Sequence, residues 1–258
     1  MMSKDSWKVT VFNQKKFVSP ILIEGLPGIG NVGKIVVDYI IEETKAEKIM
    51  DFFSYSLPNS VFVNENNLVG LPKLELYYKK LNNQDYLFLA GDVQPATEDG
   101  SYSFTELILD IVEKHGCKEI ITLGGIGLAE IPLKPAVYCA ANDIKFIQKF
   151  IKVGAKKEVY GIVGPIMGVS GLLVGMSFAR KMKATALLAE TLGHPMYLGL
   201  PGAKESLDIL CKVYGFKISM KSLDKEIKNM ENGDGDDGDP KTSSLQKLKR
   251  IKEMNYIG

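Results

Sequence analysis

The stretch ILIEGLPGIGNVGKIVV, residues 21–37, decides the fold. It begins with a short apolar run, residues 21–23, which is typical of a buried strand. A sharp turn is expected next, because four glycines follow in close succession: Gly25, Gly28, Gly30 and Gly33. Residues 34–41 then supply enough apolar length for a helix packed on a sheet. Strand, glycine turn and helix together form the architecture of a phosphate cradle, because glycine lets backbone N–H groups approach an anion at a helix N-terminus.

This stretch partly matches two nucleotide-binding motifs. The spacing Gly28-x-Gly30-x-x-Gly33 matches the dinucleotide fingerprint, and Asp51 lies at about the right distance to meet a ribose. Asp51 is followed by two phenylalanines, however, so it sits inside an apolar run. The spacing also approaches a Walker A loop, but Ile35 stands where a magnesium-binding hydroxyl belongs. We therefore predict that the Gly25–Gly33 turn is structural or interfacial, with binding of a nucleotide or small anion as the alternative.

Length and composition favour one large α/β domain with a tail. The chain has 258 residues, of which 45% are hydrophobic and 24% charged, which is ordinary for a globular protein. A net charge of +1 predicts no recruitment of nucleic acid or of acidic membranes. Three scattered cysteines (Cys117, Cys139 and Cys211) indicate a reducing compartment without a disulfide framework. No signal-peptide core or long apolar run is present, so we expect a cytoplasmic protein.

The first half of the chain predicts strands around the glycine turn and its helix. Strands are expected at residues 7–12 and 48–54, and an antiparallel meander at 61–63, 74–78 and 86–89, where asparagine-rich turns separate β-rich runs. From Ser101, apolar residues recur at spacings of three and four up to His115-Gly116, which predicts a helix.

The second half predicts further alternation of strands and helices. Strands are expected at 119–123, 136–140, 159–163 and 184–189, and helices within 142–153, 172–182, 203–214 and 223–230. Two more glycine turns are expected, one at Gly124, Gly125 and Gly127 and one that includes Gly168 and Gly171. This pattern favours a sheet covered on both faces, in which ligands and partners meet the carboxyl ends of the strands.

The sequence contains no complete catalytic or metal-binding motif. Gly168-Val169-Ser170-Gly171 resembles a nucleophile elbow, but its second glycine comes one residue early. Of the two histidines, His115 is expected at a helix end, whereas His194 lies in a glycine-bounded loop and is the better functional candidate. The run 234–239 lacks the glutamate and glycine of a calcium loop, and no Cys/His spacing resembles a zinc site. We predict no catalytic residues, metal or cofactor.

The C-terminal region changes character, which divides the chain into a body at 1–225 and a tail at 226–258. Residues 232–240, NGDGDDGDP, have the composition of a flexible linker. Beyond it, apolar residues at spacing three alternate with basic ones and predict a marginal amphipathic helix: Leu245, Leu248, Ile251 and Met254. The chain ends in Tyr256, Ile257 and Gly258, whose free carboxylate could enter a pocket on a partner; the alternative is a frayed terminus.

Four segments, taken in order, resemble the sequences of the archaeal proteasome assembly chaperone family. Members of this family contain a domain of the proteasome assembly chaperone 2 type. They are GLPGIGNVGK at 25–34, GGIG at 124–127, GPIMGVSGLL at 164–173 and GHP at 193–195. The resemblance spans about residues 5–225, and the tail is similar to extensions found in the family.

This resemblance implies a three-layer α/β/α fold with a mixed, mostly parallel sheet, of the phosphorylase/hydrolase-like type. It also implies a non-enzymatic chaperone or adaptor that forms a homo-oligomer and binds the α-subunits of the proteasome core particle. In the family, a C-terminal motif of a hydrophobic residue, tyrosine and any residue docks between α-subunits. Tyr256 here is third from the end and Ile257 takes the penultimate place. The other hypothesis is an enzyme or sensor that binds a nucleotide or small anion at the glycine turns.

Overall fold

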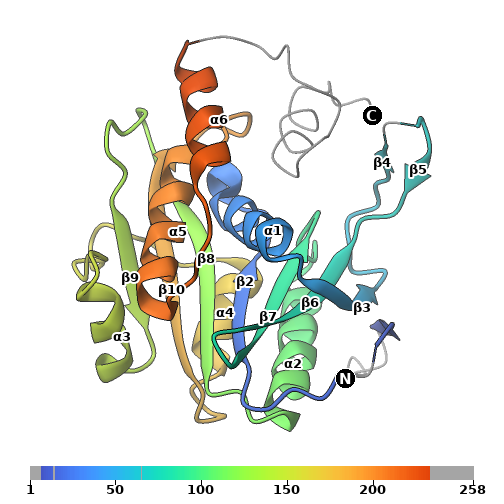
Figure 1. Cartoon of the computed structure of the whole chain (residues 1–258). Helices are drawn as coiled ribbons and strands as arrows, with labels where there is room; N and C mark the ends of the chain where they lie inside the picture. Colours follow the sequence, from blue (N-terminus) through green and yellow to red (C-terminus); the bar gives the residue numbers. More distant parts are fainter. Residues whose placement is uncertain (1–6, 14, 65, 233–258) are drawn as a thin grey trace.

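An eight-stranded sheet lies at the centre of the molecule (Figure 1). The computed structural model describes residues 7–13, 15–64 and 66–232. The strand order is β1-β3-β6-β7-β2-β8-β10-β9. The bounds are β1 Lys8–Val11, β2 Ile21–Gly25, β3 Glu47–Phe53, β6 Leu74–Leu81, β7 Gln84–Gly91, β8 Glu119–Leu128, β9 Val137–Ala141 and β10 Lys183–Leu192. Two short strands, β4 (Phe62–Val63) and β5 (Val69–Gly70), form a separate hairpin.

The sheet is mixed, with its parallel part in the middle. β7, β2, β8 and β10 pair in parallel, whereas β6 is antiparallel to β7 and β9 is antiparallel to β10. β3 is antiparallel to β6 and therefore points the same way as the four central strands, while β1 is antiparallel to β3. Most strands thus share one direction, as predicted, and their carboxyl ends lie along one end of the sheet.

Helices cover both faces of the sheet, which confirms the three-layer α/β/α prediction. α1 and α5 pack together on one face, accompanied by α3 and α6, and α2 packs against α4 on the other. The bounds are α1 Val32–Thr44, α2 Glu98–Lys114, α3 Ile144–Ile151, α4 Gly168–Met176, α5 Leu200–Tyr214 and α6 Lys221–Asn232. A short 3₁₀ turn, η2 (Ile29–Asn31), precedes α1.

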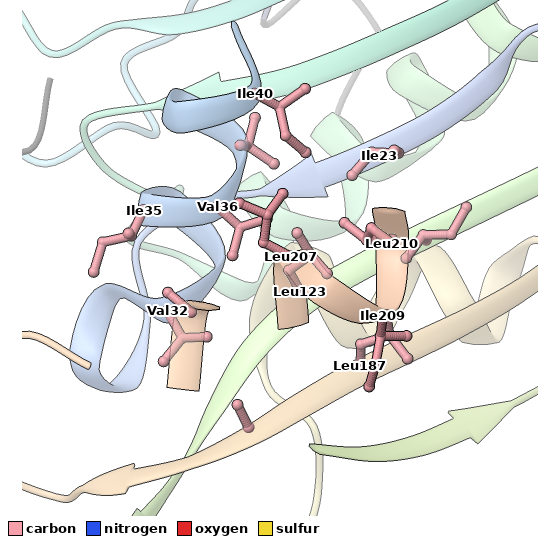
Figure 2. Close-up of a cluster of buried hydrophobic side chains, with 14 of the residues drawn as sticks. Ile23, Val32, Ile35, Val36, Ile40, Leu123, Leu187, Leu207, Ile209 and Leu210 are labelled. Atoms are coloured by element: carbon pink, nitrogen blue, oxygen red, sulfur yellow. The ribbon is translucent and has the colours of Figure 1, made fainter. Parts of the chain in front are cut away.

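The core between the sheet and the α1–α5 layer is built mostly from aliphatic side chains (Figure 2). α1 contributes Val32, Ile35, Val36 and Ile40, which meet side chains of α5 and of β2, β8 and β10 in this layer. All four are 1% exposed or less. Burial of each such side chain stabilises the fold by roughly 1.5–3 kcal/mol relative to leaving it in water. The helix predicted after the glycine turn is therefore a central part of the core.

Local sequence signals account for several element boundaries. The Thr97 side chain accepts the Gly100 N–H at 3.0 Å and caps α2, which begins three residues before the predicted start at Ser101. Asn82 and Asn83 both have positive φ, at 49° and 62°, and connect β6 to β7 as a two-residue hairpin turn. Gly215, with φ of 69°, ends α5 in the left-handed conformation.

Four predicted elements require correction. Residues 61–63 do not join the meander, because β4 pairs only with β5. Residues 159–163 form no strand beyond one isolated bridge between Tyr160 and Val163, since Gly161 at φ of 82° turns the chain there. Residues 124–127 are not a turn, because β8 continues beside β10 to Leu128. The helix expected at 172–182 begins at Gly168 and ends at Met176.

The helix α6 connects the body to the C-terminal region. Leu223 is buried, and the Lys204–Asp224 ion pair of 2.6 Å joins α6 to α5. The predicted division at residue 225 falls inside this helix. Residues 233–258, which include most of the predicted linker, the amphipathic segment and Tyr256, Ile257 and Gly258, lie outside the described residues. No helix among the described residues is long and apolar enough to cross a bilayer.

Candidate functional site

The glycine turn lies at the carboxyl end of β2, where close packing requires glycine. A Cβ on Gly33 would lie 2.3 Å from the Leu123 carbonyl oxygen of β8. A Cβ on Gly25 would lie 2.2 Å from the Gly33 carbonyl oxygen. Both distances are below any ordinary contact, so these glycines allow the start of α1 to rest directly on the backbone of β8 and β2.

The tip of the turn packs against β8 and β10. Gly30 has φ of 62°, and its carbonyl accepts the Gly199 N–H at 2.8 Å. A Cβ on Gly125 would lie 2.3 Å from the Ile29 carbonyl oxygen, and one on Gly30 would meet the Thr191 side chain at 2.7 Å. Gly28 differs, because a Cβ there would meet nothing within 4 Å. Protein atoms therefore occupy most of the space that a phosphate cradle would leave open.

The lysine of the Walker-like spacing has carboxylate partners within the protein. Lys34 is 8% exposed, and its Nζ lies 2.9 Å from Asp38 and 3.8 Å from Asp92. Burial raises the pKa of Asp38, while the Lys34 charge opposes that shift. Val32 and Gly33, in the first turn of α1, are buried. The lysine and the helix N-terminus are thus engaged in packing.

We expect calorimetry with ATP or NAD to detect no binding tighter than about 1 mM, near −4 kcal/mol. The physical reason is the buried first turn of α1 and the pairing of Lys34 with Asp38. The measurement is a titration of the full chain with each nucleotide, in the presence of magnesium. Micromolar affinity for either nucleotide would contradict the packing role and restore the nucleotide-binding alternative.

A buried carboxyl group, Glu24, lies directly before the turn. It is completely buried, and its Oε1 accepts the Leu26 N–H at 2.8 Å and the Ser170 hydroxyl at 3.1 Å. Oε2 has no hydrogen-bond partner among the described residues, and neither has the Thr122 hydroxyl on the adjacent strand. Burial raises the pKa of Glu24 to about 7, while hydrogen bonds from Leu26 and Ser170 lower it in part. Sequence reasoning missed this residue, although an acid that ends an apolar strand is a visible signal.

Gln94 connects the turn to the start of α4. Its Nε2 donates to the Pro27 carbonyl at 2.7 Å, and its Oε1 accepts the Val169 N–H at 3.0 Å. A Cβ on Gly168 would meet Oε1 of Gln94 at 2.3 Å, and one on Gly171 would lie 1.9 Å from the Ile166 carbonyl. The glycine segments at 25–33 and 164–171 are therefore brought together through this side chain, although the second segment does not follow a strand as predicted.

The remaining catalytic candidates do not come together. Ser170 lies inside α4 and donates to Glu24, so it is not a nucleophile elbow. His194 is exposed, and its Nδ1 accepts the Met196 N–H at 3.2 Å. His115 packs on the Phe17 ring, with centroids 4.0 Å apart. In the described ranges, no group of three or more His, Cys, Asp or Glu side chains could hold a metal ion.

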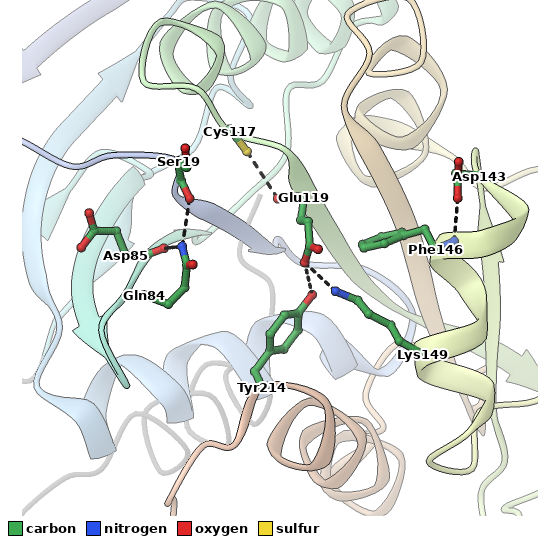
Figure 3. Close-up of polar contacts among 9 residues, drawn as sticks. All are labelled: Ser19, Gln84, Asp85, Cys117, Glu119, Asp143, Phe146, Lys149 and Tyr214. Carbon is green, nitrogen blue, oxygen red and sulfur yellow. Dashed lines mark hydrogen bonds and ion pairs between the residues drawn. The ribbon is translucent and has the colours of Figure 1, made fainter.

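The opposite end of the sheet carries a separate polar cluster (Figure 3). Glu119 Oε2 accepts from Lys149 Nζ at 2.5 Å and from the Tyr214 hydroxyl at 3.2 Å. The Lys149 ammonium also lies 4.3 Å from the ring centroid of Phe146 and 4.6 Å from that of Tyr214. Burial lowers the pKa of Lys149, and the hydrogen bond to Glu119 opposes that shift. This cluster fastens α3 and α5 to the start of β8.

The fold and the packed glycine turns define the structural class of the protein. It is a three-layer α/β/α protein in which glycine segments join helices to the carboxyl ends of the central strands. Within that class the chain belongs to the PAC2 family, whose model matches residues 22–233. The family resemblance found in the sequence is therefore confirmed.

Solved and curated relatives agree with this assignment. The structure of Pyrococcus furiosus PbaB, an archaeal proteasome activator, is 33% identical, with a TM-score of 0.81 over 88% of this chain and 96% of that one. P. furiosus PbaA, an archaeal homolog of proteasome-assembly chaperone, shares the fold at 23% identity and a TM-score of 0.74, over 89% and 90% of the two chains. The uncharacterized protein MJ1210 of Methanocaldococcus jannaschii is 30% identical over 82% of this chain and 80% of its own.

Proposed function

We propose that this protein is a non-enzymatic, cytoplasmic proteasome assembly chaperone or adaptor that binds the α-ring of the core particle. The observation that carries the proposal is the similarity to PbaB, at 33% identity and a TM-score of 0.81 over nearly the whole of that chain. Membership of the PAC2 family supports it. The close packing of the glycine turn and the internal pairing of Lys34 favour this role over nucleotide binding.

The proposal includes self-association through the body. Apolar side chains of the glycine segments reach the surface at the carboxyl end of the sheet. Ile29 and Met167 are half exposed or more, whereas Ile126 and Ile166 are partly buried. Exposed apolar groups of this kind mark interfaces between proteins. A homo-oligomer would also carry several C-terminal tails at once.

The docking element in this proposal is the C-terminal peptide Tyr256, Ile257 and Gly258. The composition of residues 233–240, which follow α6, supports a flexible tether, with a reach on the order of 15 Å for about eight residues. One tail binds weakly, because ordering a flexible segment offsets part of its contact energy. Several tails on one oligomer raise the overall affinity through effective concentration.

Deleting residues 256–258 is expected to reduce capture of the core particle at least tenfold, because it removes the aromatic anchor and the terminal carboxylate. Tyr256→Ala is expected to cause most of the same loss. The measurement is a pull-down of purified core particle by the full-length variants. The melting temperature and oligomer mass are expected to stay at the wild-type values.

Asn255→Ala is the matched control, since it alters a neighbouring side chain outside the peptide. Capture by this control is expected at the wild-type level. Full capture by the truncated protein would show that the body alone carries the contact. Failure of the wild-type protein to capture the core particle would overturn the adaptor role itself.

A further inference from the structure

The amino end of the sheet, opposite the glycine segments, carries four lysines that lie on three neighbouring elements. Lys118 directly precedes β8, and Lys183 begins β10. Lys181 lies in the turn before β10, and Lys145 lies in the first turn of α3. All four are exposed, and no carboxylate of the described residues forms an ion pair with any of them. We name Lys118, Lys145, Lys181 and Lys183 the basic patch.

Backbone contacts bring the parts of the basic patch together although they are distant in the sequence. The Lys183 N–H donates to the Lys118 carbonyl at 2.9 Å. Asn142, which leads into α3, exchanges two hydrogen bonds with the Ala184 backbone, at 3.0 and 2.8 Å. Its Nδ2 also donates to the Met182 carbonyl at 3.0 Å. β8, β10 and β9 are neighbours at a spacing of about 4.8 Å, so the backbone of the patch spans about 10 Å.

The carboxylates that surround the basic patch have partners of their own. Glu119 binds Lys149, and the Asp143 side chain accepts a backbone N–H and caps α3. Arg180 binds three carboxylates of α2: Glu106, Asp110 and Glu113. Within the described part of the chain, the four lysine charges therefore remain without a counter-charge. Like charges this close repel one another, and an anionic partner would remove that cost.

Two large apolar side chains lie beside the basic patch. Phe178 is 70% exposed in the turn after α4, and Ile144 is 78% exposed at the start of α3. The turn is tied to the chain before α3, because Asn142 Nδ2 donates to the Ser177 hydroxyl at 3.0 Å. Protein interfaces combine apolar and aromatic contact area with polar groups at the rim. The surface thus supplies charge for attraction and apolar area for contact.

The extent of the basic patch determines which kind of anion it fits. Next to it, α2 presents Glu106 and Glu113, whose side chains are 40% and 51% exposed. A nucleic acid or an acidic bilayer is an extended polyanion and would bring its charge against these carboxylates. The net charge of +1 provides no wider positive field to offset that repulsion. A short acidic segment of a protein fits within the patch and avoids α2.

We propose that the basic patch is a docking surface for a short acidic segment of a partner protein, with Phe178 and Ile144 in contact with its apolar side chains. The glycine segments lie at the carboxyl end of the sheet, and α6 leads to the tail from the top of the molecule in Figure 1, whereas the turn before β10 lies at the bottom. β8 and β10, with ten residues each, separate the two ends of the sheet by roughly 33 Å. This surface is therefore distinct from the C-terminal peptide to which the proposed function assigns the core particle.

Fluorescence anisotropy with a labelled synthetic peptide tests the docking surface. The probe is a glutamate-rich peptide with a central Leu-Phe pair, and its control has glutamine in place of every glutamate. The full-length wild type is expected to bind the acidic peptide at least tenfold more tightly than the glutamine peptide. This difference is expected to disappear in about 1 M salt, where the Debye length is about 3 Å.

Reversing two charges of the basic patch, Lys145→Glu with Lys181→Glu, is expected to weaken binding of the acidic peptide at least tenfold. The two remaining lysine charges are then balanced by two carboxylates. Both side chains are exposed, and glutamate is favourable in the first turn of a helix, so the melting temperature is expected to match the wild type. If this variant unfolds, Lys118→Gln with Lys183→Gln takes its place.

Phe178→Ala separates apolar contact from charge. It is expected to weaken binding of the acidic peptide about threefold or more and to leave the salt dependence unchanged, because it removes contact area and no charge. Lys228→Glu is the matched control for charge reversal, since Lys228 is exposed on α6, away from the basic patch. It is expected to bind the peptide as the wild type does.

Three results would overturn the inference. They are equal wild-type affinity for the two peptides, full affinity in the doubly charge-reversed variant, and tighter wild-type binding to poly(U) RNA or to phosphatidylserine vesicles than to the acidic peptide. Capture of the core particle is expected to be the same in the wild type and in this variant. Failure of the docking surface is therefore distinguishable from failure of the adaptor role.

Discussion

Gly33→Ala is expected to lower the free energy of unfolding by about 3 kcal/mol, the upper range for overpacking a well-packed site. The added methyl would lie 2.3 Å from the Leu123 carbonyl oxygen. That oxygen belongs to β8, which is paired with β2 and β10, so it cannot retreat without shifting the central strands. Elsewhere in a helix the same change would stabilise by about 1 kcal/mol. A destabilised variant in urea denaturation therefore reports the close approach of α1 to the sheet.

Gly28→Ala is the control for this experiment within the same turn. A Cβ at Gly28 would meet nothing within 4 Å, and its φ of −158° is extended backbone that any residue adopts. The change is expected to alter the free energy of unfolding by no more than about 0.5 kcal/mol. If Gly33→Ala were as stable as the wild type, helix packing would not explain the glycine, and a ligand role for the turn would regain weight.

Glu24→Gln is expected to remove a pH dependence of about 3 kcal/mol from the free energy of unfolding. The pKa of Glu24 is about 7 in the folded protein, against an ordinary value of 4.5. Below pH 4.5 both the folded and the unfolded states bind the proton, so the group has no effect on stability. Between those two pKa values only the folded state keeps the proton, and stability falls as the pH rises. Above pH 7 the folded state also releases the proton, so the loss of stability is complete. Its size follows from a cost of about 1.36 kcal/mol for each pH unit between the two pKa values.

The measurement is urea denaturation of the wild type and the variant at about pH 4 and about pH 8, on either side of the two pKa values. Glutamine keeps an oxygen that can accept from Leu26 and Ser170, and its amide replaces the unpartnered Oε2. The stability difference between variant and wild type is expected to move in favour of the variant by about 3 kcal/mol over this range. Glu130→Gln, on an exposed loop, controls for loss of a negative charge. Parallel pH profiles for wild type and Glu24→Gln would contradict the assignment.

Most of the fold could be predicted because its signals are local. The apolar run at 21–23, the helical spacing from Phe104 to Val112 and the asparagine turn at 82–83 act over a few residues. Each signal therefore produced the expected element. Residues 159–163 were predicted wrongly because an apolar run of that length indicates a strand only if a neighbour pairs with it, and the described residues of the sheet provide none there. Residues 62–63 do form a strand, but it pairs with β5 in a separate hairpin and not with the meander.

The sequence by itself determined the class of fold, the family and the glycine segments that carry the resemblance. These follow from residue type and short-range order, which the chain carries whatever its environment. Only the tertiary structure decided what those glycines do. Gly33 and Gly25 permit contact with backbone that is distant in the sequence or across the turn, and Gly124, Gly125 and Gly127 lie within a strand. It also decided the state of Glu24, because a carboxyl group changes its pKa only when neighbouring elements exclude water from it.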